Sequence, residues 1–146
     1  MLKPQDLVIL LKLAIEPVQA RQQQEVARVV GVSQAEVSLS LRRCSESHLY
    51  EPVEKRVRVP HLIELLAHGV KYFYPAVLKG QGRGFKTAWA APPLSEKLKI
   101  EQDSSPPVWA HEKGDTLGQV VIPIYRSVPD AALRDPSTAF LKLEKL

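Results

Sequence analysis

Apolar positions repeat at helical spacing in the first thirty residues of the chain. The first group falls at i, i+3, i+4 and i+7, which predicts an amphipathic helix over residues 4–15. Its members are Leu7, Leu10, Leu11 and Ala14. Pro4 suits the first turn of this helix, and Pro17 ends it. A second helix is predicted over residues 21–30, with Gly31 as the residue that ends it. Its apolar face consists of Val26, Ala27 and Val30.

The third predicted helix carries a start signal in its first turn. The segment from Ser33 to Glu36 has the S-x-x-E pattern of a capping box. In that motif the serine hydroxyl accepts from a backbone N–H of the first turn, and the glutamate reaches back. The helix then runs to about Ser45, with an apolar face of Val37, Leu41 and Cys44. The second helix, a short turn and a capped third helix follow in close order, which is the layout of a helix-turn-helix.

Two short apolar runs follow the third helix. Residues 49–53 and 57–59 read as paired strands, and the charged residues between them form the expected tip of a hairpin. A fourth helix is predicted over residues 60–74, ended by Pro75. Its apolar stripe consists of Leu62, Ile63, Leu66, Val70 and Phe73.

The rest of the chain is rich in proline and is expected to be mostly loop. One strand is predicted over residues 119–125, and a last amphipathic helix over residues 137–146. The pattern therefore predicts a mainly α protein with a small β-hairpin. We expect a helix-turn-helix domain over residues 1–60 and a loop-rich α+β extension over residues 61–146, which begins with the fourth helix.

Composition limits the classes of function. The chain has 146 residues, 45% of them hydrophobic, and a net charge of +4, which permits an anionic partner. Its longest apolar run, residues 7–11, is far shorter than the roughly 20 residues that cross a bilayer. We therefore expect a cytoplasmic protein without membrane contact. A single cysteine, Cys44, forms no intrachain disulfide, and the four histidines lack zinc-site spacing. We predict no metal and no cofactor.

One stretch of the chain is purely basic. Residues 65–95 contain no Asp or Glu, and their four cations equal the net charge of the whole chain. The stretch includes GQGRGF, whose glycines are not followed by the Gly-Lys-Ser/Thr of a Walker loop. A dinucleotide fingerprint is also disfavoured, because no clear strand precedes these glycines and Pro92 blocks a following helix. We interpret GQGRGF as a flexible loop, with a second nucleic-acid contact as the next alternative.

Three segments, SQAEVSLSLRRC, SHLYEP and VRV, follow one another from the third helix through the hairpin. Here the chain resembles the winged-helix DNA-binding regulators of the broad MarR-like class, over residues 1–60. The resemblance implies a winged helix-turn-helix whose third helix enters the major groove of DNA. It also implies that the helix after the wing makes a dimer interface. The run LLAHGVKYFYPAVLKGQGRGFKTAWAAPPL resembles a group of uncharacterised bacterial winged-helix proteins.

Candidate DNA contacts follow from this layout. They are Gln34, Ser38, Leu39, Arg42 and Arg43 on the third helix, and Lys55, Arg56 and Arg58 on the hairpin. The polar and charged side chains can hydrogen-bond to bases or phosphates, and Leu39 can touch a thymine methyl or be packed inside. Alternatively, the two arginines are a solvated helix end favoured by the helix dipole, and the hairpin cations protect an exposed edge.

These observations predict a sequence-specific duplex-DNA-binding transcriptional regulator, a homodimeric repressor from a bacterium. No enzyme activity is predicted, because no serine, histidine or carboxylate lies in a nucleophile-elbow context. The alternative comes from another class. It is a protein-interaction module, such as the antitoxin or regulatory subunit of a two-gene system, whose C-terminal half binds a protein partner. A third option is that both hold, with the first half binding DNA and residues 61–146 serving dimerisation or the binding of a partner or ligand.

Overall fold

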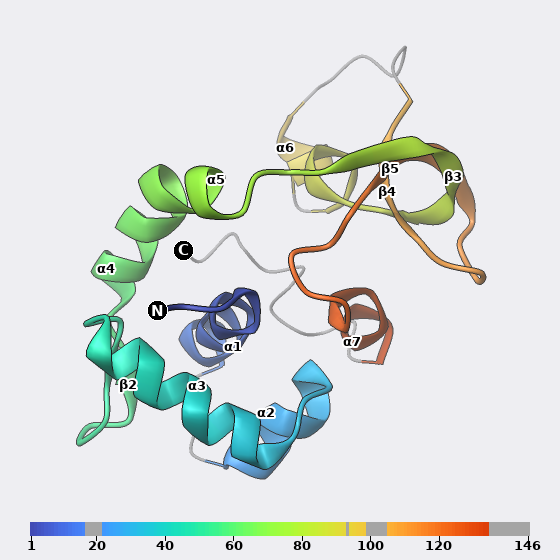
Figure 1. Ribbon diagram of the computed structural model, residues 1–146. Helices are drawn as coiled ribbons and strands as arrows, with labels where there is room; N and C mark the ends of the chain where they lie inside the picture. Colours follow the sequence, from blue (N-terminus) through green and yellow to red (C-terminus); the bar gives the residue numbers. More distant parts are fainter. Residues whose placement is uncertain (17–21, 93, 99–104, 135–146) are drawn as a thin grey trace. The chain divides into compact units, whose positions relative to one another are not determined.

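The computed structural model describes residues 1–16, 22–92, 94–98 and 105–134 (Figure 1). The fold is mixed α+β, with more strand than the predicted mainly α protein. The chain forms two compact units. The first unit contains residues 1–75 and the described residues from 124 onward, and the second contains residues 76–123. The predicted last helix, residues 137–146, lies outside the described residues.

Three helices build the core of the first unit: α1 (Pro4–Ile15), α2 (Gln23–Val30) and α3 (Gln34–Glu46). The predicted bounds of α1 are confirmed. Its buried surface is wider than one amphipathic face, because α1 contacts α2, α3 and strand β2 (Arg56–Val57). Val8 and Ile9 are therefore fully buried, whereas Leu11 and Ala14, predicted on the apolar face, are only half-buried.

The turn between α2 and α3 follows the predicted pattern in part. Gly31 ends α2 in the left-handed conformation, with φ at 77°, which glycine adopts without strain. The Ser33 hydroxyl accepts a hydrogen bond from the Glu36 backbone N–H at 3.1 Å, as expected. The reciprocal half of the capping box is absent, because the Glu36 carboxylate accepts from Gln5 and Arg43 instead.

A short hairpin joins α3 to the next helix. Strands β1 (Tyr50–Glu51) and β2 pair antiparallel, with Tyr50 opposite Val57. Val59, predicted as the end of a strand, instead begins the next helix, where Pro60 suits the first turn. The hairpin is therefore shorter than predicted.

The predicted fourth helix is present as three consecutive pieces. These are α4 (Val59–Glu64), the π-helical turn η2 (Leu65–Gly69) and α5 (Val70–Phe73). Of its predicted apolar stripe only Leu62 is fully buried, while 40% of Ile63 and 73% of Phe73 are exposed. By its contacts this helix belongs to the first unit, although the sequence prediction grouped it with residues 61–146.

The chain returns to the first unit after residue 123. Helix α7 (Val128–Arg134) contacts α2, and its Val128 and Ala131 are buried. The Ser127 hydroxyl donates to the backbone carbonyl of Val30 at 2.5 Å, next to the turn that leads into α3. Sequence patterns did not predict this helix.

The second unit is a closed sheet of three strands: β3 (Leu78–Lys86), β4 (Pro107–Ala110) and β5 (Thr116–Val121). β3 runs antiparallel to both neighbours, and β4 and β5 are parallel to each other. The short helices η3 (Ala88–Ala90) and α6 (Leu94–Lys97) follow β3. The strand predicted over residues 119–125 overlaps β5. The interpretation of GQGRGF as a flexible loop was wrong, since it lies within β3.

Glycines allow the three strands to close on one another. A Cβ added at Gly84 would lie 1.9 Å from the carbonyl oxygen of Trp109. A Cβ added at Gly118 would lie 2.1 Å from the carbonyl oxygen of Pro106. Such contacts are sterically forbidden, so a side chain at either position requires the strands to move apart. Close strand packing thus requires glycine at Gly84 and Gly118.

The described helices include none whose length and hydrophobicity would let it span a lipid bilayer.

We expect a Gly84→Ala substitution to destabilise the second unit by about 1–3 kcal/mol or more, because the added methyl meets backbone atoms that cannot rotate away. Gly80→Ala is the matched control, since a Cβ at Gly80 meets nothing within 4 Å. It should change stability by about 0.5 kcal/mol at most. Both tryptophans, Trp89 and Trp109, lie in the second unit, so urea unfolding followed by tryptophan fluorescence reports on it. Equal midpoints for the two variants would contradict the close-packing explanation.

Candidate nucleic-acid interface

Helix α3 has one buried face and one exposed face. The buried face packs in the core through Val37, Leu41 and Cys44. The exposed face carries Gln34, Ser38, Leu39 and Arg42. Leu39 is 51% exposed and the Arg42 side chain 78% exposed, so both are available to a partner on this side of the helix.

An open groove of about 420 Å³ runs between α3 and the hairpin. It brings together Ser38 and Arg42 from α3 and Lys55 from the hairpin tip, three of the residues predicted from the sequence. Its other lining residues are Gln23, Leu41, Ser45, Tyr50 and Pro52. Tyr50 and Leu41 are themselves buried, so the groove has an apolar floor and polar, cationic edges.

The cations at the groove are weakly held. Arg42 pairs with Glu46 one turn along the helix at 3.2 Å, and both side chains are largely exposed. An exposed pair of this kind contributes about 0–1 kcal/mol, so Arg42 can exchange Glu46 for another anion at small cost. Lys55 makes no ion pair with any residue that the structure describes.

The other hairpin cations do not line this groove. Val57 is buried while Arg56 and Arg58 are exposed, as strand alternation predicts. Arg56 pairs with Glu54, and Arg58 pairs with Glu51 at 2.7 Å. The hydrogen bond from Arg58 lowers the pKa of Glu51. Gln34 and Leu39 are exposed on α3 but also lie outside the lining of the groove.

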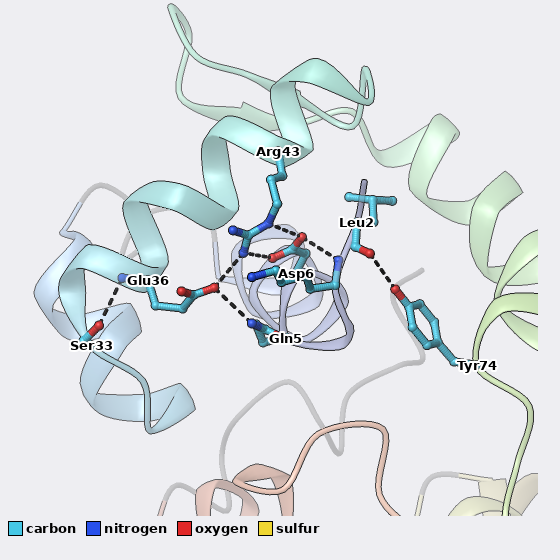
Figure 2. A network of polar contacts seen from close by, with 8 residues as sticks. Leu2, Gln5, Asp6, Ser33, Glu36, Arg43 and Tyr74 are labelled. Carbon is cyan, nitrogen blue, oxygen red and sulfur yellow. Dashed lines mark hydrogen bonds and ion pairs between the residues drawn. The ribbon is translucent and has the colours of Figure 1, made fainter.

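Arg43 does not line the groove, and its side chain points toward Asp6 of α1 (Figure 2). Its Nε and Nη2 donate to the two carboxylate oxygens of Asp6 on α1, at 2.9 and 2.7 Å. Nη2 also donates to Glu36 at 2.6 Å. The Arg43 side chain is 15% exposed and Asp6 is fully buried. Arg43 was predicted to face a DNA groove, but a buried carboxylate needs a charged partner and Arg43 supplies it.

Two further groups complete the network around Arg43. The backbone N–H of Lys3 donates to Asp6 at 2.8 Å, and the Gln5 amide donates to Glu36 at 3.0 Å. Burial raises the pKa of Asp6, but the hydrogen bonds from Arg43 and Lys3 outweigh it and hold that pKa below its ordinary value. The hydrogen bonds from Arg43 and Gln5 lower the pKa of Glu36. Both carboxylates are therefore ionised at neutral pH.

Sequence reasoning missed Asp6 as the partner of Arg43. The signal for it was one acidic residue beside the apolar face of α1, but acidic residues are also common in the first turn of any helix. The partner lies 37 residues away, beyond the reach of a local pattern.

Cys44 is a core residue. Its side chain is fully buried, and burial raises the pKa of its thiol to about 12. Among the described residues, no three His, Cys, Asp or Glu side chains lie close enough together to hold a metal ion.

Comparisons with protein-family models, with curated proteins and with solved structures found no match to this chain. What supports a function is therefore the geometry of α3, the hairpin and the groove between them.

We expect the two adjacent arginines to differ sharply in their effect on stability. Arg43→Ala leaves the buried Asp6 carboxylate without its cation, which should lower the free energy of unfolding by about 3–5 kcal/mol. Arg42→Ala removes one exposed ion pair and should cost under about 1 kcal/mol. Urea unfolding followed by far-ultraviolet circular dichroism measures both. Similar losses in the two variants would contradict the assigned roles.

The stability difference between wild type and Arg43→Ala should depend on pH. Because the folded pKa values of Asp6 and Glu36 are lowered, the network stabilises the protein above their ordinary values of 3.8 and 4.5. This stabilisation is lost as the pH falls through the folded values. Urea unfolding from neutral pH down to the acid range should show the difference shrinking below about pH 4.5. A constant difference across that range would argue against an ionic network.

Proposed function

We propose that the chain is a sequence-specific duplex-DNA-binding transcriptional regulator with a winged helix-turn-helix. In this proposal α3 enters the major groove and the β1–β2 hairpin is the wing. The observation that carries it is the groove in which Ser38 and Arg42 of α3 meet Lys55 of the hairpin. A recognition helix and a wing that share one cationic groove suit a curved polyanion such as the DNA backbone.

The groove residues have distinct roles in this proposal. Arg42 carries a guanidinium that fits the two acceptors of a guanine in the major groove. The flexible ammonium of Lys55 suits a phosphate oxygen, and the Ser38 hydroxyl suits either a base or a phosphate. Leu39, exposed next to Ser38, offers an apolar contact to a thymine methyl. Arg42 and Leu39 would thus provide sequence specificity, and Lys55 would add an electrostatic attraction that does not depend on sequence.

Arg43 supports the same function from inside the unit. Its bidentate pair with Asp6 joins α3 to α1. Its bond to Glu36 lies within α3, and Glu36 in turn accepts from Gln5 of α1, which makes a second link between the two helices. A recognition helix held in one orientation loses less conformational entropy when it binds. Arg43 is thus a positioning residue, and Arg42 is the arginine that contacts DNA.

Arg56 and Arg58 contribute less to DNA binding in this proposal than Arg42 and Lys55. Each already pairs with a glutamate of the hairpin, so a phosphate would have to displace that glutamate. Exposed pairs of this kind exchange at low cost, so both arginines can still add to the attraction for the backbone.

Exposed apolar side chains support a homodimer. On the helix from Val59 to Phe73, Tyr72 is 76% exposed and Phe73 is 73% exposed, with Ile63 at 40%. Large exposed apolar side chains on one helix mark an interaction surface. A two-fold dimer through this helix would present two copies of α3, as a palindromic operator requires.

The same exposed residues favour the alternative of a protein-interaction module. In that case a partner protein, as in a two-gene antitoxin or regulatory-subunit system, would cover them. The two functions differ in their response to salt. DNA binding through several phosphates weakens steeply as salt rises, whereas an apolar protein interface does not.

Fluorescence anisotropy with a labelled duplex from upstream of the protein's own gene tests the proposal. Wild type should bind selectively, and more tightly at low than at near-physiological salt. Arg42→Ala should weaken specific binding by about 1–3 kcal/mol, or 5- to 150-fold, while Lys55→Ala should weaken all duplexes alike. Arg28→Ala is the matched control, because Arg28 is also an exposed arginine paired within its helix but does not line the groove.

The control separates a specific contact from loss of charge. If the Arg42→Ala and Arg28→Ala variants bind the duplex with equal affinity, α3 is not the helix that contacts the bases. No selective binding of wild type at either salt concentration would favour the protein-interaction module.

A further inference from the structure

Strand β3 has an inner and an outer face. Gly82 and Gly84 face the neighbouring strands, because a Cβ at Gly82 would meet Val120 and one at Gly84 would meet Trp109. Successive side chains of a strand point to opposite sides, so Gln81, Arg83 and Phe85 lie on the outer face. Gln81 and Arg83 are exposed and Phe85 is half-buried, in agreement with this placement.

Aromatic rings gather beside Arg83 on this outer face. Phe85 lies directly opposite Trp109 of β4, and both are half-exposed. The His111 ring lies 5.1 Å from the Phe85 ring, centroid to centroid. Leu117, which is opposite Arg83 on β5, is 70% exposed. The face is therefore apolar and aromatic at its centre, with a cation next to it.

The cations of β3 differ from the arginines of the first unit. Lys79, Arg83 and Lys86 are all exposed, and none makes an ion pair with a residue that the structure describes. No acidic residue occurs anywhere in residues 65–95. In the first unit Arg42, Arg43, Arg56 and Arg58 are each paired with a carboxylate. The cations of β3 are thus not held in ion pairs with described residues, and they can attract an anionic partner.

We propose that the outer face of the β3–β4–β5 sheet binds single-stranded nucleic acid. Arg83 would contact phosphates, and Phe85 and Trp109 would stack against unpaired bases. Exposed rings beside cations on a sheet suit this ligand, because unpaired bases present their flat faces while a duplex keeps them stacked inside. The proposal concerns the second unit and a different form of nucleic acid, so it stands independently of duplex binding by α3.

Anisotropy of a short fluorescein-labelled oligothymidylate with the full chain tests this proposal. Wild type should bind, and affinity should fall as salt rises. Phe85→Leu keeps an apolar side chain but removes the ring, and should weaken binding about 5- to 150-fold, as loss of one stacking platform does. Arg83→Ala, at a fully outward position, should also weaken binding. Quenching of tryptophan fluorescence by the oligonucleotide gives a second readout of stacking near Trp109.

Two controls locate the site. Lys71→Ala removes an exposed cation from α5 of the first unit, outside the three-stranded sheet, and should leave affinity unchanged. Arg42→Ala should leave oligothymidylate binding unchanged even if it abolishes duplex binding, which separates the two proposals.

Several outcomes would overturn the inference. One is no binding of wild type at low salt. Another is an equal loss in Arg83→Ala and Lys71→Ala, which would mean unspecific charge attraction. A third is competition by an unrelated duplex as effective as that by the single strand, which would exclude base stacking.

Discussion

The ion pair between Arg43 and the buried carboxylate of Asp6 determines how the first unit presents its surface. It joins α3 to α1 across 37 residues of sequence, and the bond from Arg43 to Glu36 extends the link to the start of α3. Adjacent residues of a helix point about 100° apart, so the inward direction of Arg43 leaves Arg42 on the outside. The groove with Ser38 and Lys55 follows from this rotation of the helix.

The two units carry their positive charge in different ways. In the first unit the arginines of α3 and the hairpin are balanced by nearby glutamates or by Asp6, so an anionic ligand would have to displace a carboxylate from each arginine that it contacts. In the second unit the cations of β3 have no such partners among the described residues. A ligand that must displace a carboxylate from an arginine is favoured when its own groups match the arginine geometry. Unpaired cations beside aromatic rings instead favour nucleic-acid binding with little sequence preference.

Local patterns predicted α1, α3 and the Gly31 ending of α2 well, because these depend on periodicity and capping within a few residues. They missed α7. They failed where distant residues decide the outcome. The role of Arg43 depends on Asp6, and the second half of the capping box is lost because Glu36 binds Arg43. GQGRGF has the composition of a loop, and only the approach of β4 explains why glycine is required at Gly84 within a strand.

A double-mutant cycle between Asp6 and Arg43 measures the coupling on which the first unit depends. Asp6→Asn, Arg43→Gln and the double variant are compared with wild type by urea unfolding at neutral pH. We expect a coupling free energy of about 1.5–3 kcal/mol, as for residues that share a buried ionic network. Single effects that add to within about 0.5 kcal/mol would contradict the assignment, because independent residues behave in that way.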